Sequence, residues 1–368
     1  MAQSHCLCLL DRPEITLRFR DLPYYYDTWR RTRAIFPSSD EERLAAIASP
    51  EANFRPDATF SMRAEHPDFQ APEHGRKFVF GTPEYRVLLA QNTGAIRSAR
   101  EVAETVDVIT PSRWTALAYE RFGFPPDRVH VVPHGIDPRI VRPDATSRSA
   151  SRKALGVGDR FVFMSVGAMT PNKGIDLLLR AFDEVARTEP DACLLLKGAD
   201  GLYPSKELLQ ASMMELPAAA RERVASRLVY RGETYSSRNM AAFMRAADCY
   251  VAPYRAEGFN MPVLEAAASG VAVICTAGGP TDEFTLPSFA ARIRSHVVPQ
   301  PLSATEMGEA LSPDLGHLIE LMRAAAADRA TTQQRGAAAA QYVAQRSTWD
   351  AVTEQLLDAL FPSGKPQG

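Results

Sequence analysis

The sequence lacks several features that would place it in a specialised class of protein. Its 368 residues carry a formal net charge of −2, so no global excess of positive charge attracts nucleic acid or an anionic membrane. No apolar run approaches the length that crosses a bilayer. The N-terminus has no basic segment and reaches an acid at Asp11, so we expect no secretory signal.

Cysteine is scarce, and its placement excludes two further classes. The five cysteines form an odd set, and three of them lie inside apolar, strand-like runs. This pattern predicts reduced, buried thiols in a cytoplasmic protein rather than a disulfide framework. Cys6 and Cys8, beside His5, lack the second half of a zinc pattern, so we expect no metal site there.

From about residue 150 onward, short β-rich runs alternate with helical patterns. The expected strands are Phe161–Gly167, Cys193–Gly198, Leu228–Gly232, Cys249–Tyr254 and Val271–Thr276. Apolar strands that alternate with helices predict an α/β domain, in which helices cover both faces of a parallel sheet. In such a Rossmann-like domain, the ligand binds at the carboxyl ends of the strands.

The first half is less regular, with expected strands at Thr59–Ala64, Phe78–Thr82, Val106–Thr110 and Arg128–Pro133. Residues 138–158 are rich in Arg, Ser, Pro and Asp, and are interpreted as an interdomain linker. Near the end, Ala324–Arg346 and Thr348–Phe361 have helical patterns. We therefore expect an N-terminal domain of residues 1–145, a second domain of 146–345, a C-terminal helix of 346–361 and a disordered tail of 362–368.

One loop in the second half has the pattern of an anion site. The strand that starts at Cys249 breaks at Pro253, and a helix is expected to begin near Pro262 with Asn260 as its N-cap. The backbone amides of Phe259, Asn260 and Met261 would then face outward at the positive end of the helix. Such an end binds an anion such as a diphosphate.

Two carboxylates, Glu257 and Glu265, bracket this loop with seven residues between them. A carboxylate accepts hydrogen bonds from sugar hydroxyls, so the pair and the anion site together suit a nucleotide-sugar donor. Taken alone, the loop also fits an ordinary helix with a surface glutamate in its first turn.

The run from Glu257-Gly-Phe-Asn-Met-Pro-Val-Leu-Glu265 to Val273 resembles the Glu-x7-Glu signature of the retaining GT-B glycosyltransferases of family 4. It departs at Asn260, where the family usually has glycine, and at Ala272, where proline is common. The resemblance covers about residues 106–285 and implies two Rossmann-like domains that face a central cleft. No glycine-rich opening precedes the crossing turn at His134, so the N-terminal domain looks shortened or remodelled.

The resemblance implies a set of donor-binding residues: Lys173, Gly174, Glu257, Gly258, Phe259, Asn260, Met261 and Glu265. Glu257, the catalytic candidate, would bind hydroxyls of the transferred sugar and stabilise positive charge at its anomeric carbon. Glu265 would bind the ribose diol, and Lys173 the diphosphate. The arginine that often follows the strand in this family is replaced by Ala168-Met169, so one phosphate clamp is missing.

On the acceptor side, three histidines are candidates for a role. His66 follows an expected strand end, as a catalytic histidine does in the family, although it also fits a loop histidine without a role. His74 is a weaker candidate of the same kind. His134 lies in the crossing turn, where a hinge role is favoured.

The absence of any Asp-x-Asp motif leaves the divalent-metal route of GT-A enzymes unsupported, so neither metal nor cofactor is expected. The predicted function is retaining transfer of a sugar from a nucleotide-diphosphate sugar to an unidentified glycan, lipid-linked or small-molecule acceptor, in polysaccharide or glycoconjugate synthesis. Arg12–Arg33, with six arginines against three acids, could contact a membrane peripherally, or form a solvated surface.

Two other functions remain open. The shortened first domain and the missing clamp fit a catalytically impaired protein that binds a nucleotide sugar or a partner enzyme. A nucleotide-sugar 2-epimerase is the third possibility, which the Glu-x7-Glu arrangement disfavours.

Overall fold

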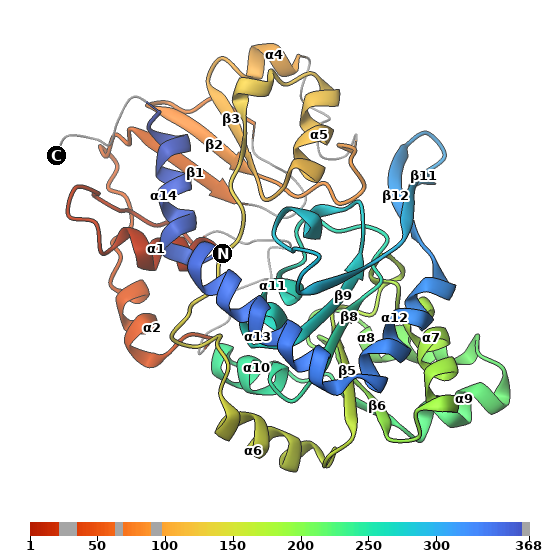
Figure 1. Ribbon diagram of the computed structural model, residues 1–368. Coiled ribbons are helices and arrows are strands. Elements are labelled where there is room, and N and C mark those ends of the chain that lie inside the picture. The colour runs from red at the N-terminus through yellow and green to blue at the C-terminus, as the bar shows by residue number, and fades with distance from the viewer. Residues whose placement is uncertain (22–34, 63–68, 90–97, 363–368) are drawn as a thin grey trace. The chain divides into compact units, whose positions relative to one another are not determined.

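The computed structural model describes residues 1–21, 35–62, 69–89 and 98–362, and divides the chain into two compact units (Figure 1). The first comprises Met1–Gly135, Pro299–Glu309 and Ser347–Gly368, and the second comprises Ile136–Val298 and Ala310–Arg346. The chain thus first passes between the units at Gly135 and Ile136, whereas the sequence placed a boundary near residue 145. Among the described residues, no helix is both long enough and apolar enough to cross a bilayer.

The first unit contains a four-stranded parallel sheet. Its elements are α1 (Ala2–Leu9), α2 (Ser38–Ala45), β1 (Ala58–Met62), β2 (Arg76–Phe80), α4 (Ala99–Val102), β3 (Val106–Thr110), α5 (Arg113–Phe122), η1 (Pro126–Arg128), β4 (Val129–Val131) and α14 (Trp349–Leu360). The strands lie in the order β1-β2-β3-β4, which is also their order in the sequence. The four strands expected in this half are confirmed to within two residues over the part that the structure describes.

Alternate side chains of the first sheet pack into two separate cores. Val79 points into a cluster with Tyr119 of α5, whereas Phe78 and Phe80 pack into a cluster with Leu356 of α14. This is the period of two that a strand imposes on a sheet covered on both faces. The last helix of the chain therefore supplies one cover of the first sheet.

The second unit contains a six-stranded parallel sheet. Its elements are α6 (Ala145–Leu155), β5 (Phe161–Val166), η2 (Pro171–Lys173), α7 (Ile175–Thr188), β6 (Ala192–Lys197), α8 (Ser205–Met214), α9 (Ala218–Ala225), β7 (Leu228–Arg231), α10 (Ser237–Met244), β8 (Cys249–Ala252), α11 (Met261–Ala268), β9 (Ala272–Thr276), η3 (Pro280–Glu283), β10 (Ala290–Ile293), α12 (Leu315–Ala327) and α13 (Arg329–Arg346). The strand order is β10-β9-β8-β5-β6-β7. This is the doubly wound order, which reverses between β5 and β8.

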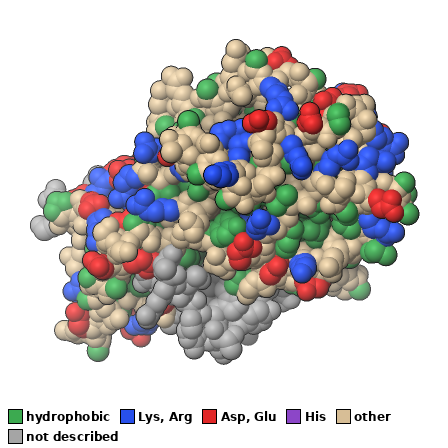
Figure 2. All heavy atoms as spheres, turned by 90° about the horizontal axis from the view of Figure 1, so that it is seen from below, with side chains coloured by type: hydrophobic (Ala, Val, Ile, Leu, Met, Phe, Trp, Pro, Cys, Tyr) green, Lys and Arg blue, Asp and Glu red, His purple; other side chains and the backbone are tan. Residues whose placement is uncertain are grey.

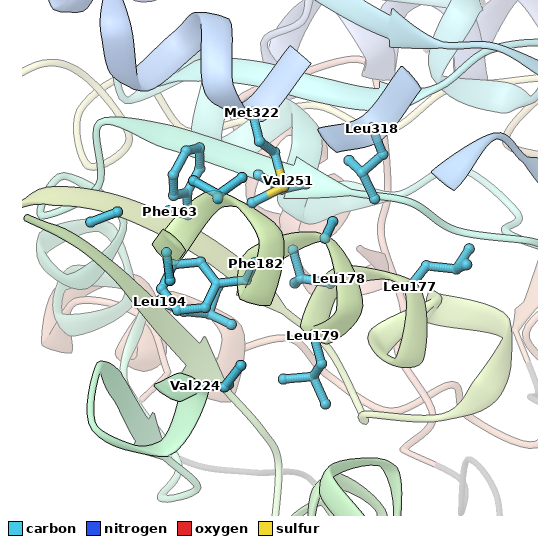
Figure 3. Close-up of a cluster of buried hydrophobic side chains, with 14 of the residues drawn as sticks. Phe163, Leu177, Leu178, Leu179, Phe182, Leu194, Val224, Val251, Leu318 and Met322 are labelled. Atoms are coloured by element: carbon cyan, nitrogen blue, oxygen red, sulfur yellow. The ribbon is translucent and has the colours of Figure 1, made fainter. Parts of the chain in front are cut away.

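The core of the second unit lies between this sheet and the helices α7 and α12 (Figure 3). Phe163, Leu194 and Val251 contribute from three neighbouring strands, while Phe182 comes from α7 and Met322 from α12. The five strands expected in this half are confirmed to within two residues. Four of them are apolar runs buried on both faces, and the edge strand β7 is half-buried.

Residues 138–158 are not a linker throughout, because they contain helix α6. Asp144 caps its N-terminus by accepting a hydrogen bond from the Ser147 amide, 2.9 Å away. The buried contacts of α6 are ionic: Arg148 and Arg152 both reach the carboxylate of Asp248, at 2.6 and 3.1 Å. A helix that packs through arginines has no apolar stripe, which explains why its sequence suggested a linker.

Three further features differ from expectation. The helix expected over Ala324–Arg346 is two helices, α12 and α13, because Asp328 accepts a hydrogen bond from the Thr331 amide at 2.9 Å and caps the second. Strand β10 was not predicted, since Ala-Ala-Arg-Ile has no continuous apolar run. A hairpin of β11 (Ser295–Pro301) and β12 (Met307–Pro313) was also missed.

The tip of this hairpin, Pro299–Glu309, groups with the first unit. There the Glu309 carboxylate lies 2.9 Å from the guanidinium groups of both Arg86 and Arg121. The Glu309 amide also donates a hydrogen bond to the Tyr85 carbonyl at 2.8 Å. These contacts attach the hairpin tip to the first unit.

Charges of both signs are mixed on the surface seen in Figure 2, where Lys and Arg side chains are scattered among Asp and Glu. The basic segment Arg12–Arg33 lies partly outside the described residues, which stop at Asp21. Within the described part, Arg12 forms an ion pair with Glu354 at 2.5 Å, and Arg18 one with Glu51 at 3.4 Å. Both arginines are therefore already paired with acids of the first unit.

Candidate functional site

The candidate site lies where the strand order of the second unit reverses. β5 and β8 are adjacent and parallel, with Met164 opposite Tyr250, so the loops that follow them leave the same edge of the sheet. In a doubly wound sheet, this reversal opens a crevice at the carboxyl ends of the strands. Lys173 comes from the loop after β5 and Glu257 from the loop after β8.

Gly174 lets the two loops approach closely. It has a left-handed backbone with φ of 71°, and a Cβ atom there would overlap the carbonyl oxygen of Pro253. Only glycine combines this conformation with this close contact at little cost. The sequence indicated Gly174 through its family pattern, and the structure supplies the steric reason.

A set of hydrogen bonds joins the loop after β5 to the loop after β8. The Asn172 carbonyl accepts from the amides of Arg255 and Ala256, at 2.7 and 3.3 Å. The Asn172 side chain donates to the Ala256 carbonyl at 3.3 Å. The residues immediately before Lys173 and Glu257 are thus held together by backbone and side-chain bonds.

Arg255 adds a charged link between the same segments. Its guanidinium forms a bidentate pair with Asp176 of α7, with distances of 2.7 and 2.6 Å, and donates to the Pro171 carbonyl at 2.8 Å. Burial alone would raise the pKa of Asp176, but the hydrogen bonds and charge of Arg255 outweigh it and lower that pKa. Planar, two-point pairing fixes orientation as well as distance.

The structure brings Lys173 and Glu257 into direct contact. The Lys173 Nζ atom lies 2.8 Å from Oε1 of Glu257, with the lysine side chain 23% exposed and the glutamate 9% exposed. Gly167, at the end of β5, leaves room for the stem of Lys173, whose Cγ would lie 3.5 Å from an added Cβ. Two residues that the family resemblance assigns to the donor site therefore form one ion pair.

The helix predicted after Glu257 is confirmed as α11, with Asn260 as its N-cap. Asn260 has a positive φ of 75°, and its side chain accepts a hydrogen bond from the Val263 amide at 3.4 Å. Asparagine is among the residues that tolerate this left-handed conformation best after glycine. That tolerance explains how asparagine stands where glycine is usual.

Glu265 and Phe259 lie on either side of this cap. The Glu265 side chain projects from α11, and its burial raises the pKa of the carboxyl group to about 7. The Phe259 ring stacks on Phe284, with centroids 4.6 Å apart and an angle of 23° between the rings. This stacking anchors the loop segment Gly258–Met261 through the apolar side chain of Phe259.

Lys197, which ends β6 at the same edge of the sheet, was not predicted as a site residue. It is buried, its Nζ donates to the Gly198 carbonyl at 2.5 Å, and it lies 5.0 Å from the ring centre of Tyr235. Burial lowers its pKa, while the charges of Glu233 and Asp200 act in the opposite direction. The only signal was a single lysine at the end of an apolar run.

Two of the three acceptor-side histidine candidates, His74 and His134, are described by the structure, and both belong to the first unit. His66 lies within residues 63–68, outside the described part of the chain. His74 is exposed in the loop before β2. His134 is buried in the first unit, with its ring centre 5.9 Å from that of Phe80 and 6.2 Å from that of Trp349. Burial lowers the pKa of His134 to about 3, which keeps it neutral.

Within the described ranges, no three His, Cys, Asp or Glu side chains are arranged so that they could hold a metal ion. At the position of the missing arginine clamp, Met169 is buried, with a positive φ of 60°. The cationic groups of the site are therefore Lys173, Arg255 in its pair with Asp176, and Lys197 on the neighbouring strand.

Comparison with known proteins identifies the segment that contains both loops. The family described as "Glycosyl transferases group 1" matches residues 160–293. A GDP-mannose-dependent alpha-(1-6)-phosphatidylinositol monomannoside mannosyltransferase of Mycolicibacterium smegmatis is 30% identical over 220 residues, which are 57% of this chain and 55% of that protein. A D-inositol 3-phosphate glycosyltransferase of Xylanimonas cellulosilytica is 28% identical over 77% of this chain and 61% of that protein. The chain thus spans less than two thirds of either relative.

Solved structures show the same fold. Anabaena HepE in complex with UDP and glucose superposes with a TM-score of 0.63 at 17% identity, over 78% of this chain and 72% of that one. Sucrose-phosphate synthase from Thermosynechococcus elongatus has a TM-score of 0.60 at 20% identity, over 79% of this chain and 69% of that one. At such identities the likeness is one of fold alone.

Proposed function

Because the chain carries a glycosyl transferases group 1 domain and has the GT-B fold, we propose that it transfers a sugar from a nucleotide-diphosphate sugar to a hydroxyl acceptor. The observation that carries the proposal is the contact between Lys173 and Glu257 at the reversal point of the sheet. The proposal gives Lys173 the diphosphate and Glu257 the sugar hydroxyls, and the contact supports it by joining a cation to a carboxylate that lies just before α11. Lys173, Glu257 and α11 all lie within the matched segment.

The proposed chemistry uses charge placement and orientation. Lys173 and the amides before Pro262 hold the diphosphate, and Glu257 accepts hydrogen bonds from hydroxyls of the transferred sugar. The bond between the anomeric carbon and the phosphate oxygen breaks while the acceptor oxygen bonds to that carbon on the same face. The acceptor's proton passes to the departing phosphate. This route retains the anomeric configuration and needs no divalent metal.

Glu265 would bind the ribose diol, which is common to the donor and the free nucleotide. Since burial raises its pKa to about 7, its ability to accept two hydrogen bonds depends on pH in the neutral range. It would therefore act on nucleotide binding rather than on the transfer step.

The relatives supply the first substrates to test. One is named as using GDP-mannose on a phosphatidylinositol monomannoside, and another as acting on D-inositol 3-phosphate. We propose a phosphorylated polyol, free or lipid-linked, as the acceptor, and the cytoplasm as the place of action. A lipid-linked acceptor would bring the protein to the membrane surface.

The test is an activity panel of UDP-, GDP- and ADP-sugars with inositol phosphates and phosphatidylinositol, run with and without excess EDTA. One donor should be consumed under both conditions, and NMR of the product should show the donor's anomeric configuration. Glu257→Gln should lower turnover by about 10²-fold, in the range for one lost transition-state partner. Glu222→Gln, at an exposed position of helix α9, is the control and should be unaffected. Loss of activity in EDTA, or an inverted product, would overturn the proposed route.

A second candidate, nucleotide-sugar binding without transfer, is favoured by one observation. The family's second phosphate clamp is absent at Ala168 and Met169, and the nearby Arg255 is paired with Asp176. The same panel decides, because this protein would bind a donor in calorimetry and neither transfer nor hydrolyse its sugar. Conversion of the donor sugar to its 2-epimer would instead reveal an isomerase.

A further inference from the structure

The ion pair between Lys173 and Glu257 joins two groups whose proposed ligands differ in charge. Lys173 would bind the anionic diphosphate, whereas Glu257 would bind neutral sugar hydroxyls. In the structure the two groups are 2.8 Å apart, so each is the other's partner before any ligand arrives. A ligand must therefore compete with Glu257 for Lys173.

We propose that this ion pair makes the site prefer the intact nucleotide-sugar donor over the nucleoside diphosphate that remains after transfer, with Glu257 as the specificity-determining residue. The inference rests on the proposed function. The donor brings hydroxyls that replace the hydrogen bonds Glu257 loses when Lys173 turns to the diphosphate. The free nucleoside diphosphate brings only further negative charge, so Glu257 opposes its binding.

The surroundings of Glu257 hold its carboxylate beside Lys173. Its side chain is 9% exposed, and the loop before it is fastened to Asn172 and, through Arg255, to Asp176. A buried carboxylate that cannot swing into solvent keeps its charge close to Lys173 and to any bound phosphate. Charge repulsion at such short range is screened little by salt.

The experiment is isothermal titration of UDP, GDP, UDP-glucose and GDP-mannose into the wild-type protein and into Glu257→Gln. The neutral variant should bind the matching nucleoside diphosphate about three- to tenfold tighter, the size of one relieved ionic interaction at a partly exposed site. Its affinity for the donor should not rise, so the preference for donor over product should shrink. In wild-type assays, the nucleoside diphosphate should accordingly be a weak product inhibitor.

Four further variants separate charge from structure. Glu257→Ser should tighten nucleoside-diphosphate binding like Glu257→Gln, since it also removes the charge, and it covers the case in which one replacement fails to fold. Lys173→Met should weaken the diphosphate, and Lys173→Met with Glu257→Gln should cancel most of the gain, because the two residues are coupled. Glu265→Gln, in helix α11, should weaken donor and nucleoside diphosphate by the same factor.

The outcomes distinguish the two proposals. Suppose that the wild-type protein transfers sugar, but both Glu257 variants fold and bind the nucleoside diphosphate no more tightly than wild type. That result would overturn the proposed preference for donor over product and would leave the proposed function intact. No binding of any nucleotide or nucleotide sugar to the wild-type protein overturns the function itself. Equal tightening of donor and product also overturns the inference, because Glu257 would then only weaken phosphate binding.

Discussion

The two units of this chain both contain parallel sheets, yet their strand orders differ. In the first, β1-β2-β3-β4 follow the order of the sequence, whereas in the second the order reverses between β5 and β8. The helices that follow β5 and β8 pack against different helices: α7 packs against α12, and α11 packs against α13. Loops that diverge in this way leave room for a ligand between them.

The carboxyl edges of the two sheets differ in chemistry as well. In the first unit, the Thr110 hydroxyl bonds to the Gly81 carbonyl at 2.8 Å and to Thr115 at 2.6 Å, so neighbouring loops are joined by neutral groups. In the second unit, the same edge presents the ion pair of Lys173 and Glu257. The proposed donor site thus differs from the edge of the first sheet in two ways, a reversal of strand order and charged side chains.

The largest expected effect comes from two left-handed glycines, one in each unit. Gly174→Ala should cost about 2–5 kcal/mol of unfolding free energy and abolish nucleotide binding, because the new Cβ overlaps Pro253 and the backbone is left-handed. Gly123→Ala should cost only about 1–2 kcal/mol, since its φ is 111° but the nearest atom to a Cβ lies 3.6 Å away. Urea unfolding and calorimetry with a nucleoside diphosphate measure both. Normal nucleoside-diphosphate binding by a folded Gly174→Ala variant would contradict the claim that this glycine is required at the site.

Next in size is Arg255, which is compared with Arg148 at the opposite edge of the same sheet. Both pair with an aspartate at 2.6 Å, Arg255 with Asp176 and Arg148 with Asp248. Arg255→Met should lower kcat/KM by up to about 10²-fold, because it releases the loop that places Glu257. Arg148→Met should destabilise the fold by about 1–3 kcal/mol and leave kcat/KM unchanged.

Recovery in Arg255→Lys would be partial, because lysine cannot reproduce the two-point pair. If both methionine variants lost only stability, Arg255 would have no positioning role.

A third prediction concerns acid stability of the first unit. His5 and His134 are buried, and burial lowers the pKa of each to about 3. Since the folded pKa lies below the ordinary value near 6.5, stability is full above that value and falls as the pH drops towards 3. Between pH 7 and pH 5, each histidine should lower the free energy of unfolding by about 2 kcal/mol. Urea unfolding of wild type and His134→Asn should show a shallower loss in the variant, and equal slopes would contradict this.

The smallest effect is expected for Glu265 in the second unit. Its effect on stability changes with pH in the opposite direction to that of the two histidines. Its folded pKa is raised to about 7, so its contribution to stability is present at low pH and is lost as the pH rises through 7. Nucleoside affinity should instead rise by up to about tenfold from pH 6 to pH 8, as the carboxylate becomes able to accept both ribose hydroxyls. Calorimetry with Glu265→Gln should give a flat profile. A profile of unchanged slope would exclude Glu265 from the ribose site.

The sequence could reveal five strands of the second unit and the start of α11 for a physical reason. Those strands are mostly apolar runs bounded by turns, and Pro262 with Asn260 indicates a helix start locally, whereas β10 has no such run. The contact between Lys173 and Glu257 was not, because it requires that β5 and β8 be neighbours, which no local pattern encodes. Arg255, Asp176 and Lys197 were missed because single charges in loops and at strand ends have no periodic signal.

The most direct test of the account is amide hydrogen exchange with and without a saturating nucleoside diphosphate. We expect added protection in residues 167–175 and 253–263, which follow β5 and β8. We expect no change in residues 81–84, 110–113 and 132–135, which follow the strands of the first sheet. Protection confined to the first-unit loops would contradict the assignment of the donor site to the reversal point between β5 and β8.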